Sequence, residues 1–251
     1  MGGNMTVLRL AYGGSRIQAE ALQNPKLNPA LLVSYWYRKG LEKTRDNILY
    51  RDYVLDSGAF SAKHAGAQID LDEYIEYCLN VAMKDPKCTE IYALDVIGDH
   101  VQSIKNAEKM WNAGVPAIPC WHINEPYSAL LHIAKEYPKI AIGGLTTIRG
   151  SHSKIAWIQK AMKMIWPKKV HGFGCGAETV IMSVPFHTVD ATSWSIRPQR
   201  FGQWQSMKID AATSLPVRKN HKIELEVEWY LKLEDQAKFR WKKEMELLES
   251  L

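Results

Sequence analysis

The feature that most constrains the fold is an alternation of short apolar runs with longer amphipathic segments. The runs are rich in β-branched residues and are too short for surface helices, a pattern typical of parallel strands buried on both faces. Eight such runs predict strands, at residues 7–12, 31–37, 53–57, 91–96, 116–121, 140–145, 170–174 and 187–192. The segments between the later runs predict crossover helices, at residues 70–84, 100–113, 126–136, 153–165 and 177–183.

Eight strands separated by crossovers predict an α/β fold, a single-domain (β/α)8 TIM barrel, and 251 residues is a usual length for one. The crossovers at 13–30 and 38–52 are less clearly helical, so a doubly wound open sheet is the alternative. That fold would need a phosphate-binding GxGxxG loop after the first strand, where this chain has Tyr12-Gly-Gly-Ser15. Residues 196–251 are expected to extend the same domain and to end in one long amphipathic helix over 222–250.

Composition and residue spacing argue against several classes of protein. No apolar run approaches the ~20 residues that span a bilayer, so no membrane partner is expected. The first residues lack the apolar core of a secretory signal, which predicts a cytoplasmic protein with reduced thiols. The four cysteines form no CxxC pair and the eight histidines no HExxH motif, so we expect no metal site and no cofactor.

Charge is distributed unevenly along the chain. Residues 216–251 hold eight Lys/Arg and eight Asp/Glu, so this part is neutral. Residues 141–208 hold nine Lys/Arg against only Glu178 and Asp190, a local charge of +7. A basic field of this kind favours a polyanionic partner such as nucleic acid, although a solvated lysine-rich surface would show the same pattern.

In a TIM barrel the active site lies at the carboxyl ends of the strands, and three aspartates fall there in this sequence. Asp56 ends the third predicted strand, Asp95 the fourth and Asp190 the eighth. Buried carboxylates are costly unless they are paired, so three of them on one rim favour a functional site. The alternative for any one of them, or for the nearby Asp99, is a helix N-cap.

Other strand ends supply groups that could contact a flat ligand. His122 follows the fifth strand, and Gly143 and Gly144 lie at the end of the sixth, where they could bring backbone amides close to a ligand. Phe60 could provide a face on which a base stacks, or could belong to the core. The glycines at 172–176 keep a phosphate site possible.

These residues resemble a known family. Asp56-Ser57-Gly58-Ala59-Phe60 resembles the DSGGF motif of tRNA-guanine transglycosylases, and Asp95, at the end of IYALD, is similar to their base-recognition aspartate. The segment IAIGGL, which ends in Gly143-Gly144-Leu145, resembles the Gly-Gly-Leu segment whose backbone faces the base. Asp190, in VDATSW, stands where the family places its nucleophile. The resemblance covers about residues 53–195.

Two departures refine the resemblance. The zinc module of three cysteines and a histidine at the C-terminus of that family is absent from this sequence, and the chain is much shorter than a bacterial tRNA enzyme. This small, zinc-free pattern is more similar to phage-type 7-deazaguanine DNA transglycosylases. The resemblance therefore implies an enzyme of the host cytoplasm that exchanges guanine in DNA for a 7-deazaguanine such as preQ0 or preQ1.

The resemblance also implies roles for individual residues. Asp190 would attack C1′ and Asp56 would act as the general acid and base, in the manner of a retaining glycosidase. Asp95 would accept hydrogen bonds from the purine, with Ser57, His122, Gly143, Gly144 and Leu145 around the base. His122 stands where the family commonly has a glutamine. Phe60 would stack on the flipped base. Basic residues would hold phosphates, namely Arg149, Lys154, Arg197 and Arg200.

Three alternatives remain at this stage. The same exchange could act on tRNA, the barrel could bind nucleic acid without catalysis, or an unrelated barrel enzyme could act on a small phosphate ester. The last would place a phosphate site after the seventh and eighth strands. A pair of carboxylates argues against a binder, since a binder has no need of a nucleophile.

Overall fold

The computed structural model describes residues 6–145, 148, 150–196 and 219–250. Eight parallel strands form one sheet in the order β4-β3-β2-β1-β8-β7-β6-β5. Their bounds are β1 (Val7–Tyr12), β2 (Ala30–Ser34), β3 (Tyr53–Asp56), β4 (Cys88–Ile91), β5 (Cys120–His122), β6 (Lys139–Gly143), β7 (Lys169–Gly172) and β8 (Thr188–Ala191). The two outer strands of this order meet through a parallel bridge between Tyr92 and Ile118. The sheet therefore curves round on itself as the predicted TIM barrel, with β1 hydrogen-bonded to both β2 and β8.

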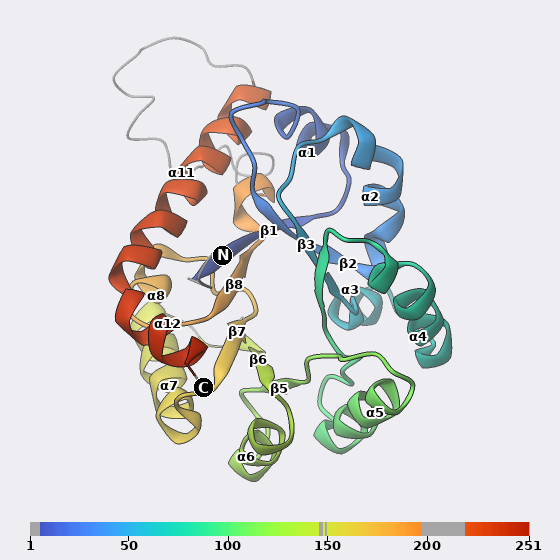
Figure 1. Ribbon diagram of the computed structural model, residues 1–251, viewed down its shortest axis with the longest axis vertical. Coiled ribbons are helices and arrows are strands. Elements are labelled where there is room, and N and C mark those ends of the chain that lie inside the picture. The colour runs from blue at the N-terminus through green and yellow to red at the C-terminus, as the bar shows by residue number, and fades with distance from the viewer. Residues whose placement is uncertain (1–5, 146–147, 149, 197–218, 251) are drawn as a thin grey trace.

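Helices surround the strands, as Figure 1 shows. They are α1 (Arg16–Ala21), α2 (Arg38–Thr44), α3 (Ala59–His64), α4 (Leu71–Asn80), α5 (His100–Asn112), α6 (Tyr127–Glu136), α7 (Ser151–Ile165), α8 (Glu178–Ile181), α11 (Lys219–Arg240) and α12 (Lys242–Glu249). The first two confirm that the early crossovers are helical, although both helices are short. The bridge between Tyr92 and Ile118, which joins the two outer strands, excludes the open-sheet alternative.

Several predicted boundaries were wrong. The second strand was expected over 31–37, but β2 ends at Ser34 and Tyr35–Tyr37 form a 3-10 helix, and the fifth was expected over 116–121, but β5 begins at Cys120. The fourth strand was expected over 91–96, but β4 ends at Ile91 and only Tyr92 continues the pairing, so Ala93 to Val96 form the loop that carries Asp95. The single helix expected over 222–250 is interrupted at Trp241, where the buried indole donates a hydrogen bond to the Ile181 carbonyl at 2.8 Å. That contact holds α12 against α8.

The buried apolar residues form two clusters, inside and outside the ring of strands. The inner cluster takes its members only from strands and their ends: Leu32, Val54, Tyr92, Ile118, Cys120 and Ala141. The outer cluster joins strand residues to the helices, and it includes Leu55, Val189 and Ala191. Because side chains alternate along a strand, the residues beside these, Asp56 and Asp190, point to the inside of the barrel. The same alternation turns Thr188 and His171 inward.

The last long helix fastens the amino end of the barrel. Glu234 of α11, whose side chain is only 2% exposed, accepts a hydrogen bond from the Leu8 backbone N–H at 3.0 Å and forms an ion pair with Arg51 at 3.1 Å. Arg51 precedes β3, so this one carboxylate joins the helix to two neighbouring regions of the sheet. Among the described helices none is long and apolar enough to cross a membrane.

Candidate active site

Asp56 is held at the end of β3 by a turn that only glycine fits. Gly58 has a φ of +82°, and a Cβ there would lie 2.3 Å from Ser34 Oγ and 2.8 Å from Trp36 Cβ. Its N–H donates to Asp56 Oδ2 at 3.1 Å. The Asp-Ser-Gly order therefore has a physical basis, because the glycine lets the chain turn back against β2 and orient the carboxylate.

Asp56 shares its site with the other two predicted aspartates. Burial first, and then the charges of Asp95 and Asp190, raise the pKa of Asp56 to about 7, against the opposing hydrogen bonds from the Gly58 and Ser57 backbone. Repulsion of this kind requires the three carboxylates to be near one another. The structure thus brings Asp56, Asp95 and Asp190 together at the carboxyl end of the barrel, as the sequence predicted. A carboxyl group with a pKa near neutrality suits proton transfer in both directions.

Asp190 is held through one of its two oxygens. Its side chain is 7% exposed, and Oδ1 accepts the Gly174 N–H at 2.7 Å. The His171 Nε2 atom lies 3.5 Å from the same Oδ1. Among the described residues, both contacts of the carboxylate fall on Oδ1, which leaves Oδ2 for a substrate.

Asp95 is paired with His122, which sequence reasoning did not foresee. His122 Nε2 lies 2.8 Å from Asp95 Oδ2, and both side chains are about 15% exposed (15% and 14%). The Ser57 hydroxyl donates to Asp95 Oδ1 at 3.4 Å. The sulfur of Cys120 raises the pKa of His122, and the Asp95 carboxylate adds to this effect against the opposing cost of burial. His122 therefore orients Asp95, and its Nε2 is engaged there.

Glu125 completes this side of the site, and only its position after a strand could have pointed to it. Its Oε2 accepts the His122 backbone N–H at 3.0 Å, and burial raises the pKa of its carboxyl group. Gly143 lies against the His122 ring, where an added Cβ would be 3.1 Å from His122 Cε1. Gly144 has a φ of +76°, which favours glycine. The Gly-Gly pair thus packs beside the Asp95–His122 pair.

The remaining predicted residues lie at different depths. Phe60, on α3, is 57% exposed with its ring 4.2 Å from that of His64, so it is accessible for stacking. Leu145 is buried in the outer core at 2% exposure. Lys154, on α7, is partly buried and near enough to Cys175 to act on its pKa, which burial raises. Arg149, Arg197 and Arg200 lie outside the described residues.

Two expected alternatives are answered by hydrogen bonds. Asp99 is the N-cap of α5, where its Oδ1 accepts the Gln102 N–H at 3.0 Å, so this aspartate is structural. The glycines of the β7–α8 loop have contacts within the protein. The Gly174 N–H donates to Asp190, and Gly176 packs against β8, where an added Cβ would lie 2.3 Å from Ala191 Cβ. The loop therefore supports Asp190, and nothing in its geometry favours the phosphate-ester hypothesis.

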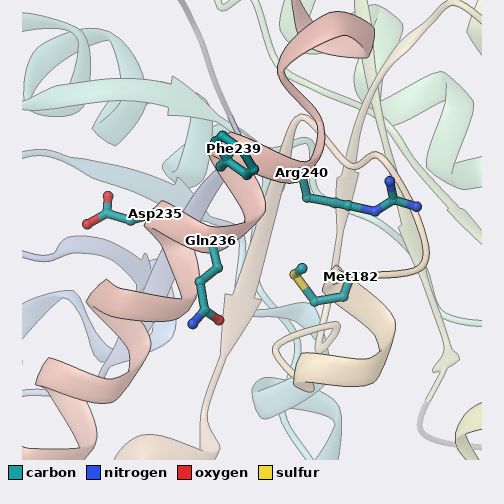
Figure 2. Close-up of a pocket in the computed structure, with 5 residues that line it drawn as sticks. All are labelled: Met182, Asp235, Gln236, Phe239 and Arg240. Carbon is teal, nitrogen blue, oxygen red and sulfur yellow. The ribbon is translucent and has the colours of Figure 1, made fainter.

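No group of three or more possible metal ligands occurs among the described residues. The described surface does contain a pocket between α11 and the end of α8, shown in Figure 2 and lined by Met182, Asp235, Gln236, Phe239 and Arg240. Its lining includes no strand-end residue, so it is separate from the site of the three carboxylates.

Comparison with known proteins places the fold. No protein-family model matches the chain, and no curated protein matches it by sequence. Among solved structures, a Coccidioides immitis protein described as a fructose-1,6-biphosphate aldolase is similar with a TM-score of 0.51 at 9% identity, over 94% of this chain and 93% of the other. A mutant tryptophan synthase α-subunit from Pyrococcus furiosus is similar with a TM-score of 0.52 at 11% identity, over 92% and 98%. At these identities the likeness concerns the fold alone: the chain is a TIM barrel.

Proposed function

We propose that this chain is a transglycosylase that exchanges guanine in a nucleic acid, preferably DNA, for a 7-deazaguanine base. The observation that carries the proposal is the pairing of two unlike carboxyl groups in one site. Asp56 has a pKa of about 7, and Asp190 is oriented through Oδ1 with Oδ2 left for a substrate. Base exchange at C1′ needs one proton carrier and one nucleophile, and the two residues match these roles.

In the first half-reaction, Asp190 Oδ2 forms a bond to C1′ while the C1′–N9 bond breaks. The electron pair of that bond leaves with guanine, which takes a proton from Asp56. The ester removes the charge of Asp190, so one of the repulsions that raise the pKa of Asp56 disappears. The carboxylate form that Asp56 adopts after giving up its proton is therefore less costly while the ester lasts. That carboxylate accepts the N9 proton of the incoming base, whose attack on C1′ returns the electron pair to Asp190 and restores the repulsion that favours protonated Asp56.

Selectivity for the base is assigned to Asp95. A carboxylate accepts hydrogen bonds only, which matches the N1–H and exocyclic amine of guanine and rejects adenine. Ser57 and His122 already bond one oxygen each, but every carboxylate oxygen has a second lone pair. His122 thus orients Asp95, and we assign the carbonyl edge of the base to the backbone at Gly143 and Gly144.

Exchange of labelled guanine is the direct test, with duplex DNA and tRNA as parallel substrates and unlabelled preQ0 as the incoming base. We expect release of label from DNA. Release of label from tRNA alone would support the same base-exchange reaction with tRNA, and not DNA, as the substrate. Binding to both nucleic acids without any release would instead support the non-catalytic barrel.

A further inference from the structure

A chain of buried polar groups runs through the inside of the barrel and ends at Asp190. Lys139 Nζ donates to the two Glu90 oxygens at 2.7 and 2.8 Å and to Thr188 Oγ1 at 3.0 Å. Thr188 Oγ1 lies 2.8 Å from His171 Nδ1, and His171 Nε2 lies 3.5 Å from Asp190 Oδ1. The proposed function uses only the last of these residues.

The carboxylate of Asp190 decides which nitrogen of His171 carries the proton. Burial lowers the pKa of His171, so the ring is neutral and has one N–H. Thr188 Oγ1 fits either tautomer, because Lys139 takes one of its lone pairs and leaves it a second lone pair and a hydroxyl proton for Nδ1. A proton on Nδ1 would turn the lone pair of Nε2 toward Asp190 Oδ1, whereas a proton on Nε2 gives that oxygen a donor. The contact therefore favours the tautomer in which Nε2 carries the proton and Nδ1 accepts from Thr188.

A packing role accounts for only part of this geometry. The His171 ring does pack on Tyr92 and Phe173, at centroid distances of 4.8 and 4.5 Å, and its Nδ1 is bonded. Its Nε2 atom, however, is buried and has no hydrogen-bond partner within the described residues. A buried polar atom in this state costs about 1–3 kcal/mol unless it gains a partner. The group it faces is Oδ1 of Asp190.

We propose that His171 is a positioning residue for Asp190, which donates its Nε2–H to Oδ1 during the reaction. This inference rests on the proposed function. With Gly174 and His171 both on Oδ1, the carboxylate presents Oδ2 to C1′. When the second half-reaction breaks the C1′–Oδ2 bond, the electron pair returns to Asp190, and the two N–H donors stabilise the carboxylate that leaves.

The wild-type chain allows a test that does not need activity. Nitrogen-15 NMR of the ring nitrogens distinguishes the two neutral tautomers of His171, with assignment by a His171→Phe variant. We expect Nε2–H. A ring protonated on Nδ1 would overturn the proposal, whether or not the protein exchanges bases.

A matched pair of variants tests the kinetic role. His171→Gln can place an amide N–H near the position of Nε2, whereas His171→Asn can reach only Thr188. We expect His171→Asn to lower kcat by roughly 10- to 100-fold, the effect of losing a hydrogen bond to a charged group, with KM for nucleic acid little changed. The covalent adduct should accumulate, because its breakdown is slowed more than its formation, and His171→Gln should restore most of kcat.

Equal kcat values in the two variants, with both folded by circular dichroism, would show that His171 serves packing alone. If the wild type releases no labelled guanine, the proposed function fails, and the tautomer measurement still decides the contact between His171 and Asp190.

Discussion

At the amino end of the barrel, partly buried acids pair with buried bases, whereas at the carboxyl end three carboxylates lie near one another. Arg9 bonds Asp52 at 2.5 Å, and Lys139 bonds Glu90 at 2.7 Å. The pairing lowers the pKa of Glu90 to about 2 despite its burial, while the pKa of Asp56 is raised to about 7. A carboxyl group is thus stabilised as an anion at one end and destabilised as an anion at the other.

This difference separates charges that hold the fold from charges available for chemistry. Removing a paired charge should damage stability and spare catalysis. Removing a carboxylate that is destabilised by burial and by neighbouring charges should lower the catalytic rate. It should leave the free energy of unfolding unchanged or raise it. Variants at the two ends can therefore confirm or break the comparison.

The largest expected effect is on catalysis, in Asp190→Ala. Without a nucleophile, exchange should fall by at least about 1,000-fold and no adduct should form. Binding of nucleic acid should be nearly unchanged, because phosphate contacts carry most of that affinity. Labelled substrate on a denaturing gel, followed by mapping of the attached peptide, measures both outcomes. An adduct mapped to Asp56 would show that the two carboxylates have been assigned in reverse.

The matching change at the amino end is Glu234→Ala. It leaves the Leu8 N–H without its acceptor and removes ion pairs to Arg51 and Lys238, although Arg51 keeps Asp52 at 3.2 Å. We expect the free energy of unfolding to fall by about 2–4 kcal/mol. Exchange per folded molecule should not change. Urea denaturation gives the first quantity and an active-site-normalised rate the second. A selective loss of rate with normal stability would contradict the division between the two ends.

Asp95→Asn should act on selectivity. The amide presents a donor where guanine also presents donors, so the expected loss is about 2–4 kcal/mol of transition-state binding. Competition between guanine and adenine sites in the exchange assay measures it. His122→Gln is the control, because it can keep a donor on Asp95 and should lose less. Unchanged kinetics in Asp95→Asn would remove this residue from the base pocket.

The smallest expected effect is a gain of stability, in Asp56→Asn. The pKa of Asp56 is raised in the folded state, from 3.8 to about 7, so the folded protein binds more protons than the unfolded chain between these values. Its stability relative to Asn therefore declines as pH rises through that window. At pH 8 the variant should be more stable than wild type by about 1–3 kcal/mol, with no such gain at pH 4. If wild type and variant had equal urea midpoints at both pH values, the folded protein would not destabilise the Asp56 carboxylate.

Much of this barrel could be predicted because parallel strands buried on both faces appear in the sequence as short, nearly continuous apolar runs. The third and eighth strands were placed to within one residue at each end. Asp56 ends β3, and Asp190 is the residue before the last of β8. The fourth strand was placed too late in the sequence because Cys88-Thr-Glu-Ile91 is partly polar, and its Glu90 serves an ion pair inside the barrel. Helix α3 was not predicted; it has six residues and begins directly after Gly58.

The partners of the site residues were less accessible to sequence reasoning. Pairing between Asp95 and His122 depends on the distance between two strand ends, which no local pattern encodes. His171 was overlooked among the neighbouring glycines. One signal was present: His171 and Phe173 stand two residues apart in the predicted strand 170–174, so their side chains were expected on the same face. A histidine that faces into a barrel needs polar partners.

The position of β1 between β2 and β8 has a consequence for synthesis of the protein. A ribosome adding 5–20 residues per second needs about 10 to 40 seconds to pass from β1 to the end of β8. During that interval one edge of the first strand has no neighbour, and an unpaired edge can join strands of other chains. The Leu8 N–H, which donates to Glu234 in the folded protein, gains this acceptor only when the later helix α11 has been made. The first strand to be made thus has, on one edge, a neighbour that is the last strand to be made.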